Sequence, residues 1–191
     1  MIDTMVAFEE KIQSNDIEQN FELANENYVL MTIHRPSNVD HRDGLTKLFS
    51  LIQYISAKNK IVFPIHPRTT KRLHEFGFYE MFASHPSLLL CEPLGYFAFQ
   101  KLIANCRYVL TDSGGIQEET TFRKKPCLTI RPNTERPSTI IIGTNTLVEW
   151  DFELIKNHID EIESGTYKTG KIPPLWDGYS TKRIVKIISE F

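Results

Sequence analysis

The chain has 191 residues, of which 41% are hydrophobic and 24% charged, and its 22 Lys and Arg nearly balance 24 Asp and Glu for a net charge of −2. These values are typical of a globular protein, and 12 Phe, 7 Tyr and 2 Trp exclude an intrinsically disordered chain. The small negative charge argues against nucleic acid as a partner, and no apolar run reaches the roughly 20 residues of a membrane span.

Short apolar runs alternate with amphipathic stretches of helical length. The runs predict strands over residues 28–34, 60–66, 87–91, 107–111, 126–131 and 146–148. The amphipathic stretches predict helices over residues 43–57, 68–76, 96–105, 114–124, 151–163 and 180–190. Because the apolar runs are continuous, the strands should be covered on both faces, which is typical of a parallel sheet. The sequence therefore predicts an α/β fold with a doubly wound parallel sheet.

Polar residues follow five of the predicted strands. The five segments are His34-Arg35-Pro36, His66-Pro67-Arg68, Glu92-Pro93-Leu94, Asp112-Ser113-Gly114-Gly115, and Arg131 with the turn that runs to Pro137. Any one of them is also typical of a loop or a helix cap. Because ligands of such sheets bind at the carboxyl ends of the strands, the five together favour a cleft for a polar ligand.

The segment DSGGIQEE, residues 112–119, leads from a strand into a helix. Glycines at positions 114 and 115 allow close approach to the backbone, and the free amides and dipole of a helix start suit a phosphate. Ser113 adds a hydroxyl donor, although a Ser-capped helix with a tight turn has the same pattern. One to two turns further on, Glu118 or Glu119 can accept hydrogen bonds from a ribose diol, and the spacing does not choose between them.

Four further positions have side chains that suit a nucleotide site. Arg136 lies in a turn beside Pro137 and can clamp a diphosphate, although an Arg–Glu surface pair is the alternative. His34 and His66 follow strands and can carry protons or bind phosphate. Phe99 lies at a spacing typical of core residues, but it can also stack on a base.

The cysteines indicate whether the chain binds a metal, and the N-terminal residues indicate where in the cell it is located. Cys91, Cys106 and Cys127 are odd in number and lack CxxC spacing, which argues against a zinc site or a disulfide framework. We expect buried, reduced thiols, with no metal and no cofactor. MIDTMVAFEEK is not a secretory signal, so a cytoplasmic location is predicted.

Five motifs in order resemble one known family. They are TIHRPSNVD (32–40), PIHPRTTKRL (64–73), PLGYFAFQKL (93–102), TDSGGIQEET (111–120) and RPNTERPSTIIIGTNTLV (131–148). They are similar to motifs of the non-hydrolysing UDP-N-acetylglucosamine 2-epimerases. The resemblance implies a Rossmann-like domain that corresponds to the C-terminal half of a GT-B fold. It also implies a hinge or linker over residues 1–27 and a UDP-binding domain over 28–191, with the N-terminal catalytic domain absent from the chain.

The resemblance also implies roles for individual residues. Ser113, Gly114 and Gly115 would bind the diphosphate of UDP, Arg136 would contact phosphate, Glu119 would bind the ribose hydroxyls and Phe99 would lie against the uracil. His34 matches a catalytic histidine near the glycosidic phosphate. Arg35 and His66 match positions that line an allosteric UDP-sugar site in some members.

The reaction implied by the resemblance inverts C2 of a UDP-N-acetylhexosamine. UDP is eliminated and added back, which interconverts UDP-GlcNAc and UDP-ManNAc for cell-surface polysaccharide synthesis, in a full-length protein expected to form a homodimer. The isolated chain is expected to be inactive, because the acid and base groups for C2 and C3 belong to the other domain. HRPSN replaces the common HRREN and Ala98 a common Asp, which leaves related UDP-sugars open. The donor-binding domain of a GT-B glycosyltransferase, or a module that only binds nucleotide, remain alternatives.

Overall fold

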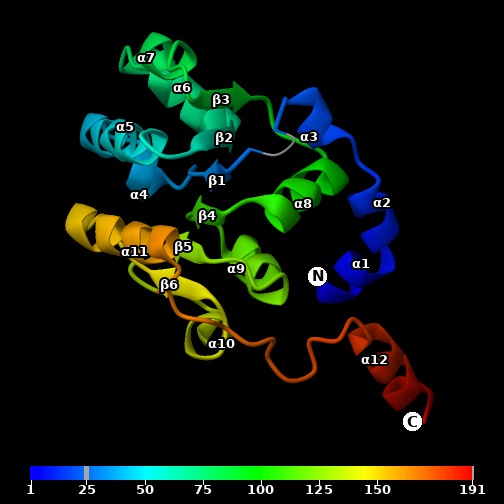
Figure 1. Cartoon of the computed structure of the whole chain (residues 1–191). Coiled ribbons are helices and arrows are strands. Elements are labelled where there is room, and N and C mark those ends of the chain that lie inside the picture. The colour runs from blue at the N-terminus through cyan, green and yellow to red at the C-terminus, as the bar shows by residue number, and fades with distance from the viewer. Residues whose placement is uncertain (24–25, 191) are drawn as a thin grey trace.

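The fold is built on one parallel sheet, seen in a computed structural model that describes residues 1–23 and 26–190 (Figure 1). Within these residues the sheet has six strands in the order β3-β2-β1-β4-β5-β6. The strands are β1 (Tyr28–Thr32), β2 (Lys60–Pro64), β3 (Leu88–Cys91), β4 (Tyr108–Thr111), β5 (Cys127–Thr129) and β6 (Asn145–Leu147). All six predicted strands are present, and the predicted doubly wound parallel sheet is confirmed.

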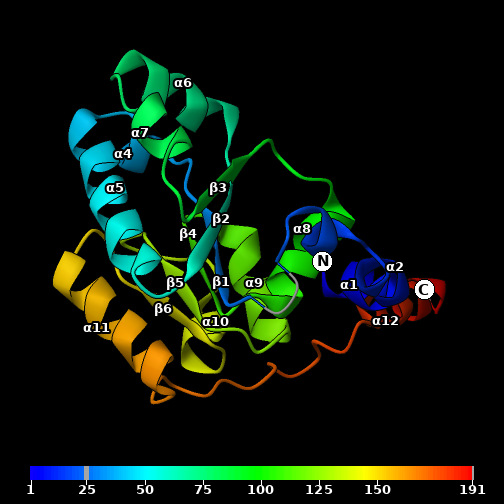
Figure 2. The ribbon, with the colours of Figure 1, turned by 45° about the horizontal axis from the view of Figure 1, so that its top comes forward.

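Helices cover both faces of this sheet (Figure 2). The six predicted helices correspond to α5 (Arg42–Ser56), α6 (Pro67–Glu75), α8 (Tyr96–Asn105), α9 (Gly114–Phe122), α11 (Phe152–Ser164) and α12 (Ser180–Ser189). Short helices add to these at α1 (Ile2–Ala7), α2 (Glu9–Gln13), α3 (Ile17–Asn20), α4 (Pro36–Val39), α7 (Tyr79–Ala83) and α10 (Pro137–Ile141). With only four or five residues each, α4, α7 and α10 are too short to show a helical pattern in the sequence.

Two apolar cores lie on opposite faces of the sheet. In β1, Val29 and Met31 point into the core formed with α5, α7 and α11, while Tyr28 and Leu30 point into the core formed with α3, α8 and α9. Each of these four side chains is at most 1% exposed. Because both faces are buried, the strands read as continuous apolar runs in the sequence.

The N-terminal helices pack against α8 and α9, the helices that cover the second of these faces. Met5 and Ile12 are fully buried, and Glu9 pairs with Arg123 at 2.9 Å between carboxylate and guanidinium. Near the other end of the chain, the backbone amide of Thr181 in α12 donates to the carboxylate of Asp3 in α1 at 2.7 Å. The hinge role of residues 1–27 stays a prediction, and residues 24 and 25 of that range lie outside the described part.

Two further expectations concern the state of the cysteines and the presence of a membrane-spanning helix. All three cysteines are free thiols. The prediction of burial is confirmed for Cys106 and Cys127 and wrong for Cys91, which is half-buried because it ends the edge strand β3. Over residues 1–23 and 26–190, no helix combines the length and the apolar character needed to cross a membrane.

Candidate functional site

The candidate site lies where the direction of strand order reverses. β1 and β4 are neighbours at the centre of the sheet, although β2 and β3 come between them in the sequence. Their last residues, Thr32 and Thr111, are partners in the register, and their hydroxyl groups lie 2.8 Å apart. The loops after these two strands lead to opposite faces of the sheet, which opens a crevice at its carboxyl edge.

A cavity of about 200 Å³ occupies this crevice. Four predicted site residues line it: His34, His66, Phe99 and Ser113. The remaining lining residues are Thr32, Pro64, Pro93, Leu94 and Ile116. The structure therefore brings together side chains from the ends of β1, β2 and β4 and from α8, as the polar strand ends predicted.

A buried carboxylate holds the loop that follows β1. Asp112 is fully buried, and its Oδ2 accepts hydrogen bonds from the backbone amides of His34 at 2.9 Å and Arg35 at 2.8 Å, and from Nδ2 of Asn38 at 2.9 Å. The Arg35 guanidinium donates through Nε to the Asp112 carbonyl at 2.9 Å. Burial alone would raise the pKa of Asp112, but the His34 ring and the Arg35 amide outweigh it and hold that pKa below its usual value.

The two predicted histidines stack beside this carboxylate. The ring centroids of His34 and His66 are 5.0 Å apart, with 27° between the ring planes. Nδ1 of His34 lies 3.0 Å from Oδ1 of Asp112, whereas Nδ1 of His66 accepts a hydrogen bond from the Arg68 amide at 3.0 Å. Burial, together with the nearby His34 and Arg68, lowers the pKa of His66. The lowered pKa favours a neutral His66 ring, and because Nδ1 is the acceptor for the Arg68 amide, the proton of that neutral ring lies on Nε2.

Two arginines from the loop after β5 converge on the start of α9. A Cβ atom added to Gly114 would lie 2.6 Å from Nη1 of Arg136 and 3.7 Å from Nη1 of Arg131. Ser113 occupies the cap position, but its side chain makes no capping hydrogen bond within the described residues. Two guanidinium groups and free helix amides therefore share one small region, and such a region suits an anion.

Carboxylates balance the charge of these arginines. Arg136 pairs through Nε with Glu118 at 2.7 Å and through Nη1 with Glu135 at 3.3 Å, so the predicted surface pair is also present. Arg131, which is only 6% exposed, binds both carboxylate oxygens of Glu135 at 2.8 and 3.1 Å. Chiefly because of Arg131, the pKa of Glu135 falls to about 2.

The sequence marks Arg131 only as the polar end of a predicted strand. Its pairing partner Glu135 is four residues further along a turn, and both belong to the RPNTER segment that carries Arg136. A buried arginine at the end of an apolar strand is unusual, because burying a guanidinium is costly unless it is paired. An arginine at the end of an apolar run is thus the sequence signal that could identify Arg131 as a paired residue of the site.

The two consecutive glutamates of α9 have different surroundings. Glu118 belongs to the arginine cluster. Glu119 is only 8% exposed. Burial raises the pKa of Glu119 to about 7, against the opposing effects of Gln100 and Arg123. Five predicted site residues lie outside the lining of the 200 Å³ cavity: Arg35, Gly114, Gly115, Glu119 and Arg136.

The buried Glu119 gives a pH-dependent stability. Its pKa of about 7 in the folded chain exceeds the ordinary 4.5, so between these values the folded chain binds more protons than the unfolded chain. Stability therefore falls as pH rises through this window and stays reduced above it, by on the order of 3 kcal/mol. Glu119→Gln should raise the free energy of unfolding at pH 8 and change it little at pH 5.

Urea denaturation at both pH values measures this effect. The matched control is Glu80→Gln, at an exposed glutamate of α7, which should give the same small change at both. An equal change for Glu119→Gln at pH 5 and pH 8 would show that burial does not shift the titration of this carboxyl.

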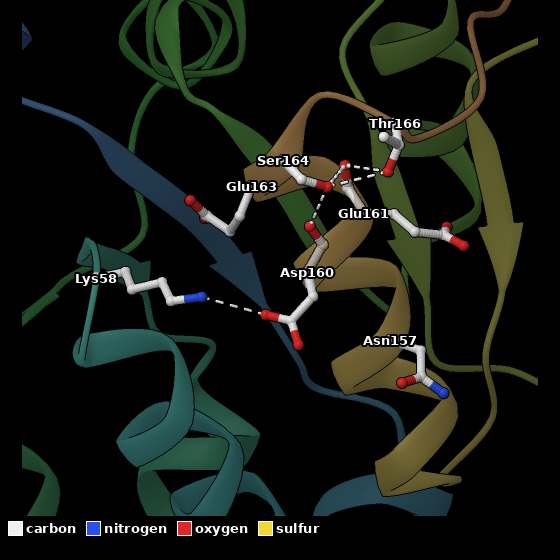
Figure 3. Close-up of a pocket in the computed structure, with 7 residues that line it drawn as sticks. All are labelled: Lys58, Asn157, Asp160, Glu161, Glu163, Ser164 and Thr166. Carbon is white, nitrogen blue, oxygen red and sulfur yellow. Dashed lines mark hydrogen bonds and ion pairs between the residues drawn. The ribbon is translucent and has the colours of Figure 1, made fainter.

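A larger hollow lies elsewhere, at the C-terminal end of α11 (Figure 3). It has a volume of about 760 Å³. Its lining residues are Lys58, Asn157, Asp160, Glu161, Glu163, Ser164 and Thr166. Lys58 is paired with Asp160 at 3.2 Å, so the hollow has an acidic lining with its one lysine already neutralised. It lacks the converging cations of the α9 start, and we assign it no ligand.

The sheet order and the crevice at its switch point define a Rossmann-like α/β domain. The family model described as "UDP-N-acetylglucosamine 2-epimerase" matches residues 1–189. The chain therefore belongs to the UDP-N-acetylglucosamine 2-epimerase family, as the motifs predicted.

Individual relatives agree with this assignment. The UDP-N-acetylglucosamine 2-epimerase of Methanococcus maripaludis is 41% identical over 166 residues, which are 86% of this chain and 45% of that protein. The solved structure of the Methanocaldococcus jannaschii enzyme in complex with UDP-GlcNAc and UDP has a TM-score of 0.84 and 35% identity, over all of this chain and 53% of that one. This chain thus spans about half the length of the curated relatives it matches.

A more distant neighbour shares only the fold. The heptosyltransferase WaaC of E. coli, solved with ADP, has a TM-score of 0.52 and 14% identity over 76% of this chain.

Proposed function

We propose that this chain is the UDP-binding part of a UDP-N-acetylglucosamine 2-epimerase. The observation that carries the proposal is the approach of Arg136 and Arg131 to Gly114 at the start of α9. A diphosphate placed there accepts hydrogen bonds from the backbone and from fixed guanidinium groups, and it also meets the positive end of the helix dipole. The related enzyme of M. jannaschii has been solved with UDP-GlcNAc and UDP, which supports the same ligand class here.

The predicted residues take their proposed roles around this diphosphate. Ser113, Gly114 and Gly115 bind it at the helix start, and Arg136 contacts a phosphate. Phe99 in the cavity wall lies against the uracil. A further two roles concern the ribose and the glycosidic phosphate: Glu119 accepts hydrogen bonds from the ribose hydroxyls, and His34 acts near the phosphate that leaves C1.

The proposed reaction is inversion at C2 by elimination of UDP and its re-addition to the 2-acetamidoglucal. UDP-GlcNAc is the first candidate substrate, and UDP-GlcNAc and UDP-ManNAc are the proposed partners. A second candidate is a related UDP-sugar, because a UDP-2,3-diacetamido-2,3-dideoxy-D-glucuronate 2-epimerase of Pseudomonas aeruginosa is 34% identical over 122 residues, 63% of this chain. Arg35 and His66 are proposed to contact a UDP-sugar, either the substrate or an allosteric one.

Turnover is proposed to require the half of the family's fold that this chain does not span. In this proposal the site forms one wall of a cleft, and its basic groups bind the phosphates rather than the sugar ring. The residues 28–191 would form the UDP-binding domain, with 1–27 as the hinge. In such a two-domain protein the apolar face of α12, with Ile184, Ile187 and Ile188 each at least 55% exposed, would pack against the other half, and the whole protein would form a homodimer.

Calorimetric titration tests the proposed ligand. UDP should bind the isolated chain in a saturable manner, and uridine should bind more weakly because it lacks the phosphates that the α9 start recognises. Equal affinities for UDP and uridine, or no binding of UDP at millimolar concentration, would contradict the proposal.

Replacing Arg136 by alanine should weaken UDP binding by about 10- to 100-fold, because a charge-assisted hydrogen bond to phosphate contributes about 1.5–3 kcal/mol. Uridine binding should change little. The matched control is Arg107→Ala, since Arg107 is 30% exposed and paired with Glu163, as Arg136 is 32% exposed and paired with Glu118. Equal losses for UDP and uridine would place Arg136 away from the phosphates.

A further inference from the structure

The carboxylate of Asp112 has two oxygens with different surroundings. Oδ2 accepts three hydrogen bonds, from the amides of His34 and Arg35 and from the side chain of Asn38. Oδ1 makes no well-aligned hydrogen bond with any described residue, and Nδ1 of His34 lies 3.0 Å from it. One oxygen therefore holds the loop after β1, and the other faces the imidazole ring.

Asp112 is held in a fixed position beside the ring. The residue is fully buried, and its partner Asn38 is itself fixed by a hydrogen bond from Trp150 Nε1 at 3.0 Å. A buried anion with one unsatisfied oxygen favours a donor opposite it, because an unpaired buried acceptor is costly. A ring nitrogen that carries a proton supplies that donor.

We propose that Asp112 is a positioning residue for His34: Oδ1 fixes the neutral ring as the Nδ1–H tautomer, so that Nε2 is a free proton acceptor at the cavity. The two ring nitrogens are distinct, and the hydrogen bond made by one decides the state of the other. When the ring takes up a proton at Nε2, the buried carboxylate faces the resulting positive charge. The catalytic meaning of this arrangement rests on the proposed function, whereas the tautomer itself follows from the geometry around Asp112.

The neighbouring His66 does not duplicate this arrangement. Its Nδ1 accepts a hydrogen bond from the Arg68 amide, so a neutral His66 ring carries its proton on Nε2. The proposal therefore gives the two stacked rings opposite tautomers. Among the described residues, Asp112 lies beside the His34 ring, whereas no ion pair joins the His66 ring to a carboxylate. Arg68, the charged group that follows His66, points to Asp40 at 2.9 Å rather than to either ring.

Nitrogen-15 NMR of the histidine rings in the 191-residue chain tests the proposal. Long-range proton–nitrogen correlations at pH 8 distinguish a protonated from an unprotonated ring nitrogen, and the loss of one set of signals in His34→Gln assigns His34 among the six histidines. The proposal predicts a protonated Nδ1 and an unprotonated Nε2. The opposite pattern in the unaltered protein would overturn it without any variant of Asp112.

Asp112→Asn adds a direct test of cause. The amide oxygen can keep the place of Oδ2 with its three donors, and the amide nitrogen then faces His34 and donates to Nδ1. The proton signal should therefore move from Nδ1 to Nε2, as in a triad whose carboxylate is replaced by an amide. His66→Gln is the control, because it removes the stacked ring but keeps Oδ1, and it should leave the His34 tautomer unchanged.

A folded Asp112→Asn protein whose His34 keeps its proton on Nδ1 would overturn the positioning role. The result is separate from the proposed function, because the tautomer is read in the free protein. If UDP fails to bind while the predicted tautomers are found, the ligand proposal is wrong and the role of Asp112 stands.

Discussion

Gly114→Val should abolish UDP binding while leaving the domain folded. A Cβ atom added at this position would lie 2.6 Å from Nη1 of Arg136, and the two methyl groups of valine would extend further into the same space. The valine side chain therefore displaces Arg136, the proposed phosphate contact, and covers the helix amides that the diphosphate approaches. Because the atoms it meets belong to the flexible end of an arginine, the arginine can move aside and the fold can persist. We expect a loss of at least 100-fold in affinity.

Calorimetry for UDP and thermal unfolding for the fold measure the two parts of this prediction. Gly95→Val is the matched control, since Gly95 precedes α8 as Ser113 precedes α9 and an added Cβ there meets nothing within 4 Å. Unchanged UDP affinity in a folded Gly114→Val protein would remove the start of α9 from the binding site.

Incubated with UDP-GlcNAc in D₂O, the 191-residue chain should leave the C2 proton of the sugar in place. Epimerisation requires groups on both faces of the sugar ring and a cleft that excludes water. The proposed phosphate site holds substrate and transition state to a similar extent and so contributes little to the rate. The described residues add one histidine–aspartate pair, which can act from one side of the sugar ring only. Mass spectrometry of the recovered UDP-sugar detects even slow exchange.

The full-length M. maripaludis relative provides the positive control for this experiment. Adding the half of that protein that this chain does not match, as a separate chain or by fusion, should produce exchange and epimerisation without a sugar acceptor. Turnover that requires an acceptor would favour the glycosyltransferase alternative. Deuterium uptake by the isolated chain alone would show that the catalytic groups are not divided as proposed.

The sequence predicted the strands well, because burial on both faces leaves a continuous apolar run that is visible without any tertiary knowledge. It placed the ends of β1 and β2 two residues too late, at His34 and His66 rather than at Thr32 and Pro64. For β1 the reason is a contact across the fold. The amides of His34 and Arg35 leave the strand to donate to Asp112, which lies 77 or more residues away in the sequence.

The pairings between side chains within the site could not be predicted from the sequence, because they too depend on contacts across the fold. The spacing of DSGGIQEE could not separate Glu118 from Glu119, because adjacent residues on a helix lie about 100° apart and their surroundings depend on the neighbouring segments. In the structure Glu118 meets Arg136 and Glu119 is buried. The assignment of Glu119 to the ribose came from the family resemblance and remains a proposal.

The most direct measurement of the proposed site is a UDP titration of the nitrogen-15-labelled chain followed by NMR. We predict saturable shifts of the backbone amides of Ser113, Gly114 and Gly115 and of the Arg136 side chain, with a common dissociation constant, and much smaller shifts with uridine. Shifts confined to other surfaces, such as the hollow at the end of α11, or no saturable shift at all, would contradict the assignment of a diphosphate to the start of α9.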